Sequence, residues 1–153
     1  MMIDPARPTL PDLPDGVEVT HDHLLDQQVH ITQPKTGYRV GSDAVLAAAS
    51  LTAGRGRVLD LGAGVGGISL CIARRLSGVQ VSAVEIDPVA AALARYNTAL
   101  NGLDQQVRVF EADITAMPAM LADSFDHVIS NPPYHHKAGT RPRHAARAVA
   151  HMG

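Results

Sequence analysis

The feature that most constrains the fold is a glycine-rich stretch at residues 60–67, DLGAGVGG. It follows a short apolar run at 57–61 and opens an apolar segment at 66–76. The order strand, glycine loop, helix is typical of α/β proteins that bind a nucleotide, because glycines permit a tight turn and a close approach of the ligand. We therefore expect a strand at 57–61 and a helix at 66–76.

Strand-like and helix-like segments alternate along the rest of the chain. One helix is expected at 43–51 with Ser42 as its N-cap, and another is opened by Asp87-Pro88 and closed by Asn101-Gly102. This alternation predicts an α/β fold with a Rossmann-like, doubly wound parallel sheet. The three further strands are expected at 79–84, 107–110 and 125–130.

Composition limits the class of protein. A chain of 153 residues with 46% hydrophobic and 18% charged residues is long enough for one folded domain and too apolar for a disordered chain. Its longest apolar stretch, residues 44–49, is too short to span a bilayer, and no secretory signal is visible, so we expect a cytoplasmic protein with no membrane partner. The single cysteine, Cys71, excludes a disulfide framework. The histidine pairs lack a third ligand at a suggestive spacing, so no metal site is predicted.

The two ends of the chain differ in character. Residues 1–22 hold four of the ten prolines, so we expect a flexible lead segment, with the folded domain occupying 23–153. A basic end suits an anionic partner such as a nucleic acid, but a solvated tail would have the same composition, so both interpretations stay open. This basic end is residues 131–153, which contain no acidic residue and four basic ones, Lys137, Arg141, Arg143 and Arg147.

Three carboxylates lie at the ends of the predicted strands. Asp60 comes two residues before the first loop glycine, Glu85 ends the second strand and Asp113 follows the third. Because the carboxyl ends of parallel strands meet at one edge of a sheet, we expect these groups to converge on one crevice. Such a crevice disfavours a pyrophosphate, which needs bare backbone N–H groups, and favours a cationic ligand. S-adenosylmethionine carries a sulfonium and an ammonium against one carboxylate, so charge favours it over NAD.

The pattern resembles the first motif of the class I S-adenosylmethionine-dependent methyltransferases, an acid followed by Gly-x-Gly-x-Gly. The resemblance implies that the loop lies against the methionyl and ribose parts of the cofactor. It also implies that Glu85 holds the ribose hydroxyls, that Ile86 lies against the adenine and that Asp113 bonds the adenine amino group. The residues it places at the cofactor are Asp60, Gly62, Gly64, Gly66, Glu85, Ile86 and Asp113.

The same resemblance raises an expectation about the sheet. Methyltransferases of this class have a seven-stranded sheet, whereas only four strands are predicted here. Residues 23–153 are therefore expected to be the N-terminal part of such a domain, truncated after the fourth strand. That strand would be an exposed apolar edge, which invites self-association.

The tetrapeptide Asn131-Pro132-Pro133-Tyr134 directly follows the fourth predicted strand. An exocyclic amine is a poor nucleophile, because its lone pair is delocalised into the neighbouring π system. If the Asn131 side-chain oxygen and the Pro132 carbonyl accept its two N–H groups, the nitrogen can aim its lone pair at the methyl group. Tyr134 offers a stacking face for a base, and Asn131 also borders the cofactor.

This tetrapeptide resembles that of the amino-methyltransferases, which act on adenine N6, guanine N2 or a protein glutamine. The lead-in at 33–46, QPKTGYRVGSDAVL, is similar to that of bacterial tRNA (adenine-N6) methyltransferases acting on valine tRNA. The resemblance implies RNA, specifically tRNA, as the substrate. A protein-glutamine or rRNA guanine-N2 methyltransferase and an inactive cofactor-binding fragment remain the alternatives. Asp43 is interpreted as a helix N-terminal charge in preference to a residue bordering the cofactor pocket.

Overall fold

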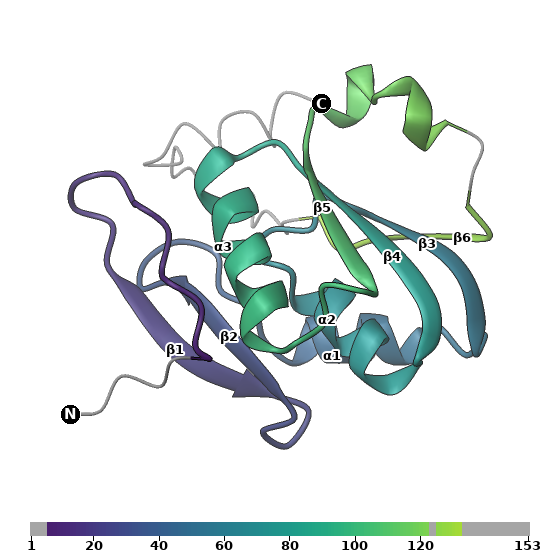
Figure 1. Cartoon of the computed structure of the whole chain (residues 1–153), viewed down its shortest axis with the longest axis horizontal. Coiled ribbons are helices and arrows are strands. Elements are labelled where there is room, and N and C mark those ends of the chain that lie inside the picture. Colours follow the sequence, from purple (N-terminus) through teal and green to yellow (C-terminus); the bar gives the residue numbers. More distant parts are fainter. Residues whose placement is uncertain (1–5, 123–124, 133–153) are drawn as a thin grey trace, which may run out of the picture.

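The computed structural model describes residues 6–122 and 125–132. Its centre is a parallel sheet of four strands in the order β5-β4-β3-β6 (Figure 1). The α/β class and the four predicted strands are confirmed. In the described part of the chain β6 pairs only with β3 and stands at one edge of the sheet. The strands are β3 (Arg55–Leu61), β4 (Gly78–Glu85), β5 (Val107–Glu111) and β6 (His127–Ser130).

The three predicted helices are α1 (Ser42–Ser50), α2 (Gly67–Arg75) and α3 (Pro88–Leu100). Helix α3 begins as predicted, since the Asp87 carboxylate accepts the backbone N–H of Val89 at 3.3 Å. The predicted cap of α1 is wrong, because the chain enters the helix one residue earlier: Gly41 is the N-cap and Ser42 is already helical. None of the helices in the described residues is long and apolar enough to cross a membrane.

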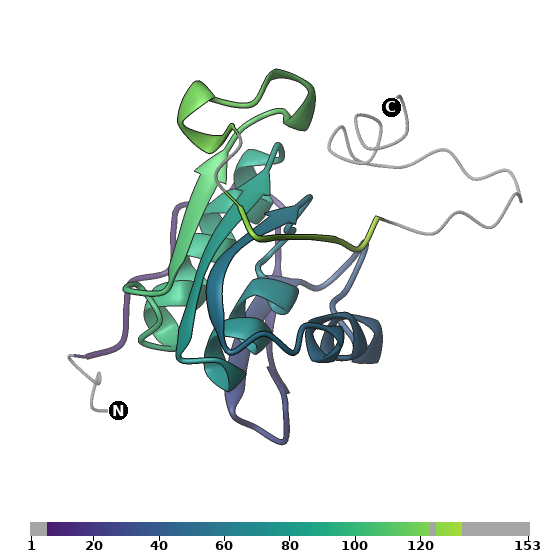
Figure 2. The same ribbon diagram turned by 90° about the vertical axis from the view of Figure 1, so that its right-hand side faces the viewer.

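The sheet has a core on each face. Neighbouring residues of a strand point to opposite faces, and the adjacent Val58 and Leu59 belong to different apolar clusters. The larger cluster joins Val58 to buried side chains of all three α-helices. The smaller one joins Leu59 to Val84 and Leu121, and includes Met117 between two short 3-10 helices. These helices, η1 (Ile114–Ala116) and η2 (Ala119–Leu121), lie beyond the carboxyl end of β5 (Figure 2).

An antiparallel hairpin precedes this sheet and was not predicted. It consists of β1 (Val19–Leu24) and β2 (Val29–Pro34), joined by a turn in which Leu25, Asp26 and Gln27 all have positive φ. Strand β1 thus starts inside the residues 1–22 assigned to the lead segment. Its central residues are polar, so the apolar alternation that marks a strand is absent.

Asn97 of α3 and Asn101, the C-cap of that helix, fasten this hairpin to α3, and Figure 1 shows β2 beside α3. The Asn97 side chain accepts the backbone N–H of Thr32 at 2.8 Å and donates to the Thr32 carbonyl at 2.9 Å. One helical turn later, the Asn101 side chain accepts from the His30 N–H and donates to the His30 carbonyl. The two amides therefore satisfy the edge of β2 that faces away from β1. Asn97 also donates to the carbonyl of Val65, which ties the hairpin to the glycine loop.

Candidate active site

The register of the sheet gathers the predicted site residues at one edge. Leu61 pairs with Val84 on one side and with Ser130 on the other, and Glu85 pairs with Glu111. The segments that follow these strands therefore start side by side. The glycine loop, the end of β4, the segment after β5 and the residues after β6 all border one crevice, as the sequence predicts.

The glycine loop needs its glycines for two separate reasons. Gly62 and Gly64 have φ of 69° and 59°, in the left-handed region, and a Cβ at either position would meet no atom within 4 Å. Space over this part of the loop is thus open to a ligand. Gly67 is different, because a Cβ there would lie 2.5 Å from Cγ1 of Val40. Gly66 is the left-handed N-cap of α2, so Gly62, Gly64 and Gly66 form the turn and Gly67 serves close packing.

Asp60 is buried beneath the loop. Its residue is 1% exposed, and its Oδ2 accepts a hydrogen bond from the Ser69 hydroxyl at 2.6 Å. Its other oxygen, Oδ1, is buried and has no hydrogen-bond partner among the described residues. Burial raises the pKa of Asp60 to about 6, with the nearby Glu85 charge adding to the effect. A buried carboxylate oxygen of this kind fits a cationic or hydrogen-bond-donating ligand.

Glu85 lies against the glycine loop. Its Oε2 accepts the backbone N–H of Gly64 at 2.7 Å, and its Oε1 accepts that of Asp87 at 2.8 Å. The carboxylate is therefore fixed between the loop and the start of α3, within reach of a ligand on either. Ile86, the next residue, is half-buried.

Asp113 lies after β5 and is exposed. Its Oδ1 accepts both the backbone N–H of Thr115 at 2.8 Å and the Thr115 hydroxyl at 2.7 Å, which makes Asp113 the N-cap of η1. These hydrogen bonds hold the pKa of Asp113 below its ordinary value. The side chain is thus an ionised acceptor at the rim of the crevice.

Asn131, the first residue after β6, contacts one side chain that precedes α1, Tyr38, and one in its first turn, Asp43. Its Nδ2 donates to Oδ2 of Asp43 at 2.9 Å and to the Tyr38 hydroxyl at 3.2 Å. Asp43 lies in the first turn of α1, as expected, but its side chain reaches across to Asn131, which the sequence interpretation missed. The hydrogen bond from Asn131 is the main cause that keeps the pKa of Asp43 below its usual range. Tyr38 and Asp43 are 93 and 88 residues from Asn131 in the sequence, so no local pattern signals these contacts.

The structure leaves part of the tetrapeptide undescribed. Pro132 is exposed beside Asn131. Pro133 and Tyr134 lie outside the described residues, as do the basic residues of 137–147. Among residues 6–122 and 125–132, no group of three or more His, Cys, Asp or Glu side chains is placed to hold a metal ion.

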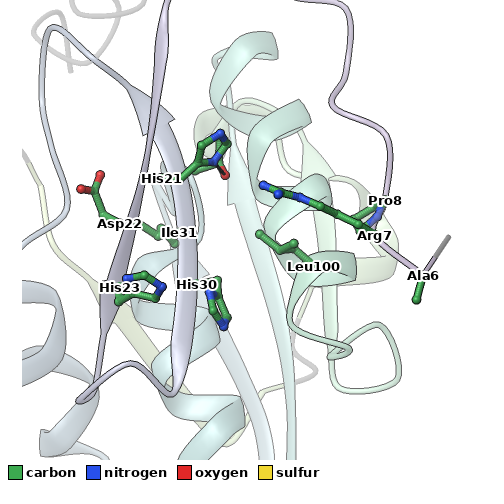
Figure 3. Close-up of a pocket in the computed structure, with 10 residues that line it drawn as sticks. Ala6, Arg7, Pro8, His21, Asp22, His23, His30, Ile31 and Leu100 are labelled. Atoms are coloured by element: carbon green, nitrogen blue, oxygen red, sulfur yellow. Dashed lines mark hydrogen bonds between the residues drawn. The ribbon is translucent and has the colours of Figure 1, made fainter. Parts of the chain in front are cut away.

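A separate hollow of about 470 Å³ lies between the hairpin, α3 and the lead segment (Figure 3). Arg7 points into it from the lead segment, opposite His21 and His30. Helix α3 begins at the carboxyl end of β4 and ends before β5, so its last residue, Leu100, lies at the opposite edge of the sheet from the glycine loop. None of the predicted site residues that the structure describes lines this hollow.

Comparison with known proteins places this arrangement in a family. A tRNA1(Val) (adenine(37)-N6)-methyltransferase of Aeromonas hydrophila is 39% identical over 131 residues, which cover 83% of this chain and 53% of that protein. The protein of the same name from Shewanella amazonensis is 39% identical over 106 residues, covering 69% of this chain and 45% of that protein. The chain thus spans about half the length of the curated relatives it matches.

The fold is shared with a solved structure. TYW2 of M. jannaschii, determined in complex with AdoMet, superposes with a TM-score of 0.63 over 82% of this chain and 55% of that one, at 23% identity. This likeness confirms the predicted α/β fold. The family model described as "Methyltransferase small domain" matches residues 36–152. The chain therefore belongs to the methyltransferase small domain family.

Proposed function

We propose that this chain transfers a methyl group from S-adenosylmethionine to the exocyclic N6 of an adenine in tRNA. One observation carries the proposal: Asn131 and the glycine loop start from paired residues of adjacent strands, Ser130 and Leu61. The Ser130 hydroxyl also donates to the Leu61 carbonyl at 3.0 Å. A group that binds the acceptor amine and a loop that holds the methyl donor are thus neighbours at one sheet edge.

The residues present fit the cofactor. Gly62 and Gly64 leave open space over the loop, and Oδ1 of Asp60, which has no partner among the described residues, suits a positively charged or donating group. Glu85, beside the loop, accepts the ribose hydroxyls, and Ile86 provides an apolar contact for the adenine. Asp113 accepts from the adenine amino group. When bound, the cofactor supplies a methyl group activated by its sulfonium.

The chain's own residues position the acceptor. The Asn131 amide oxygen and the Pro132 carbonyl accept the two N–H groups of the target amine, which frees its lone pair for attack on the methyl carbon. The N–C bond forms as the S–C bond breaks, and the amine then loses one proton to solvent. Tyr134 stacks on the target base, which is flipped out of the base stack to reach the crevice. This is catalysis by positioning, with no general base required.

The choice of tRNA rests on the names of the relatives and on charge. The basic residues of 137–147 would contact phosphates, so binding should weaken steeply as salt rises. A protein substrate would not show that dependence. Because tRNA is a cytoplasmic substrate, the proposal also implies a cytoplasmic location.

The proposal is tested by incubating the chain with S-adenosylmethionine labelled in its methyl group. Total tRNA, rRNA and a protein extract serve as separate substrates, and Asn131→Ala is the control variant. The expected result is label in tRNA, recovered as N6-methyladenosine after digestion. Label in guanine N2 of rRNA or in a glutamine side chain would identify the chain as one of the two alternative methyltransferases in place of a tRNA adenine enzyme. Label in none of the three substrates would overturn the proposal.

We further propose that residues 23–153 are the methyltransferase part and that the chain self-associates through β6. Strand β6 pairs only with β3 within the described residues, and the Val128 side chain on it is 62% exposed. An open apolar edge of this kind pairs readily with another strand. Light scattering should show association that Val128→Lys weakens, and a monomer at every concentration would contradict the proposal.

A further inference from the structure

Three hydrogen bonds join Tyr38, Asp43 and Asn131 to one another beside the carboxyl end of β6. The Tyr38 hydroxyl donates to Oδ2 of Asp43 at 2.9 Å. The Asn131 Nδ2 donates to the same Oδ2 at 2.9 Å and to the Tyr38 hydroxyl oxygen at 3.2 Å. The Asn131 amide nitrogen thus has two adjacent acceptors, the Tyr38 hydroxyl before α1 and the Asp43 carboxylate in its first turn.

A carboxylate distinguishes the two ends of an amide. The oxygen and nitrogen of an asparagine side chain are nearly equal in size, and a half-turn about the last bond exchanges them. An ionised carboxylate only accepts hydrogen bonds, so it attracts the NH₂ end and repels the oxygen end. With Nδ2 held by Asp43, Oδ1 of Asn131 is directed away from Asp43 and its partners.

We infer that Asp43 is a positioning residue that turns the Asn131 amide so that its oxygen, and not its nitrogen, is presented to the acceptor amine. This inference rests on the proposed function, in which Oδ1 must accept an N–H from that amine. An amide turned the other way would present N–H groups to N–H groups and would repel the substrate nitrogen. Asp43 therefore acts through Asn131 and does not itself touch the reacting atoms.

The local electrostatics agree with this role. The hydrogen bond from Asn131, assisted by that from Tyr38, keeps the pKa of Asp43 below its ordinary value despite partial burial. Asp43 thus stays ionised at neutral pH and retains its purely accepting character. Tyr38 supports the arrangement by donating to Asp43 and accepting from the Asn131 amide nitrogen.

The kinetic test compares Asp43→Asn with a swapped double variant. An amide at position 43 donates as well as accepts, so it no longer selects one orientation of Asn131. The loss of one charged hydrogen bond predicts a fall in kcat of about tenfold or more, with the Kd for S-adenosylmethionine unchanged. The double variant combines Asp43→Asn with Asn131→Asp. Both terminal atoms of the side chain at 131 are then oxygens, and the amide at 43 donates a hydrogen bond to one of them. Orientation is then irrelevant, so transfer should recover above that of Asp43→Asn alone.

A matched control separates this role from a general loss of a carboxylate. Asp22 in the hairpin also accepts several hydrogen bonds, from Thr20, Gln33 and Arg39, and none from Asn131. Asp22→Asn should leave kcat unchanged. Wild-type kcat in Asp43→Asn, or a double variant no faster than that single variant, would overturn the inference.

A second readout does not depend on catalysis. In ¹⁵N-labelled protein without cofactor, the side-chain NH₂ signal of Asn131 can be assigned by its absence in Asn131→Ala. A charged hydrogen bond shifts one of its protons downfield, and Asp43→Asn should move that proton back while Asp22→Asn leaves it in place. An Asn131 signal unaffected by Asp43→Asn would refute the orientation even if methyl transfer persists. Absence of transfer by the wild-type chain would refute the proposed function while leaving this measurement valid.

Discussion

Burial of Asp60 makes a prediction about stability that needs no ligand. Its pKa is about 6 in the fold, against an ordinary value of 3.8 for an aspartate side chain. Between these values the folded chain binds more protons than the unfolded chain, so the free energy of unfolding falls as pH rises. Above about pH 6 the full cost of burying the charge is present, and below about pH 4 it is absent. Each pKa unit corresponds to 1.36 kcal/mol, which gives a change of about 2–3 kcal/mol between pH 4 and pH 7.

The measurement is urea unfolding of wild type and Asp60→Asn across this pH range. The amide keeps an acceptor for Ser69 but carries no charge, so the variant should gain about 2–3 kcal/mol relative to wild type between pH 4 and pH 7. Any fixed cost of the substitution adds a constant and leaves this slope unchanged. Asp113→Asn is the control. Because the pKa of Asp113 is lowered, its ionisation changes the free energy of unfolding only below about pH 4, outside this pH range. A wild-type-to-Asp60→Asn difference that stays flat with pH would refute the buried-charge argument.

Three further substitutions test the site and its packing. Glu85→Ala should weaken S-adenosylmethionine binding by about 1.5–3 kcal/mol, since the ribose hydroxyls lose a charged acceptor. Calorimetry showing equal affinity would remove Glu85 from the cofactor site. Asn131→Ala should leave that affinity nearly intact and abolish methyl transfer, and retained turnover would exclude the amine-holding role. Gly67→Ala should destabilise the fold by about 1–3 kcal/mol, because the new methyl group lies 2.5 Å from Val40 Cγ1. In thermal unfolding, Gly67→Ala with Val40→Ala should lose less than the sum of the two single losses, and full additivity would show that this contact is not the cause.

The parts predictable from sequence are those whose signals are local. The glycine turn at Gly62 and Gly64, and the Asp87 cap of α3, each depend on residues within a few positions of one another, so pattern alone locates them. The convergence of the strand ends on one crevice then follows from the rule that the carboxyl ends of parallel strands meet at one edge of a sheet.

The features that were missed depend on distant partners. Asn97 bonds Thr32 from 65 residues away, and Asn131 bonds Asp43 from 88 residues away. No local pattern encodes either pairing, and the polar side chains of β1 hide its strand character. Asp43 had a sufficient local explanation as a helix N-terminal charge, which concealed its second role.

Asn97 of α3 and Asn101, its C-cap, affect how readily the hairpin can pair with a strand of another chain. A two-stranded hairpin ordinarily exposes two rows of backbone donors and acceptors, each able to template a foreign strand. At Thr32 and His30 those groups already have partners in the amides of Asn97 and Asn101, which act as a surrogate third strand supplied by a helix. An approaching strand would first have to displace four side-chain hydrogen bonds. These side chains thereby block intermolecular pairing at this edge. Among the described residues, no side chain is seen to occupy the free edge of β6 in the same way.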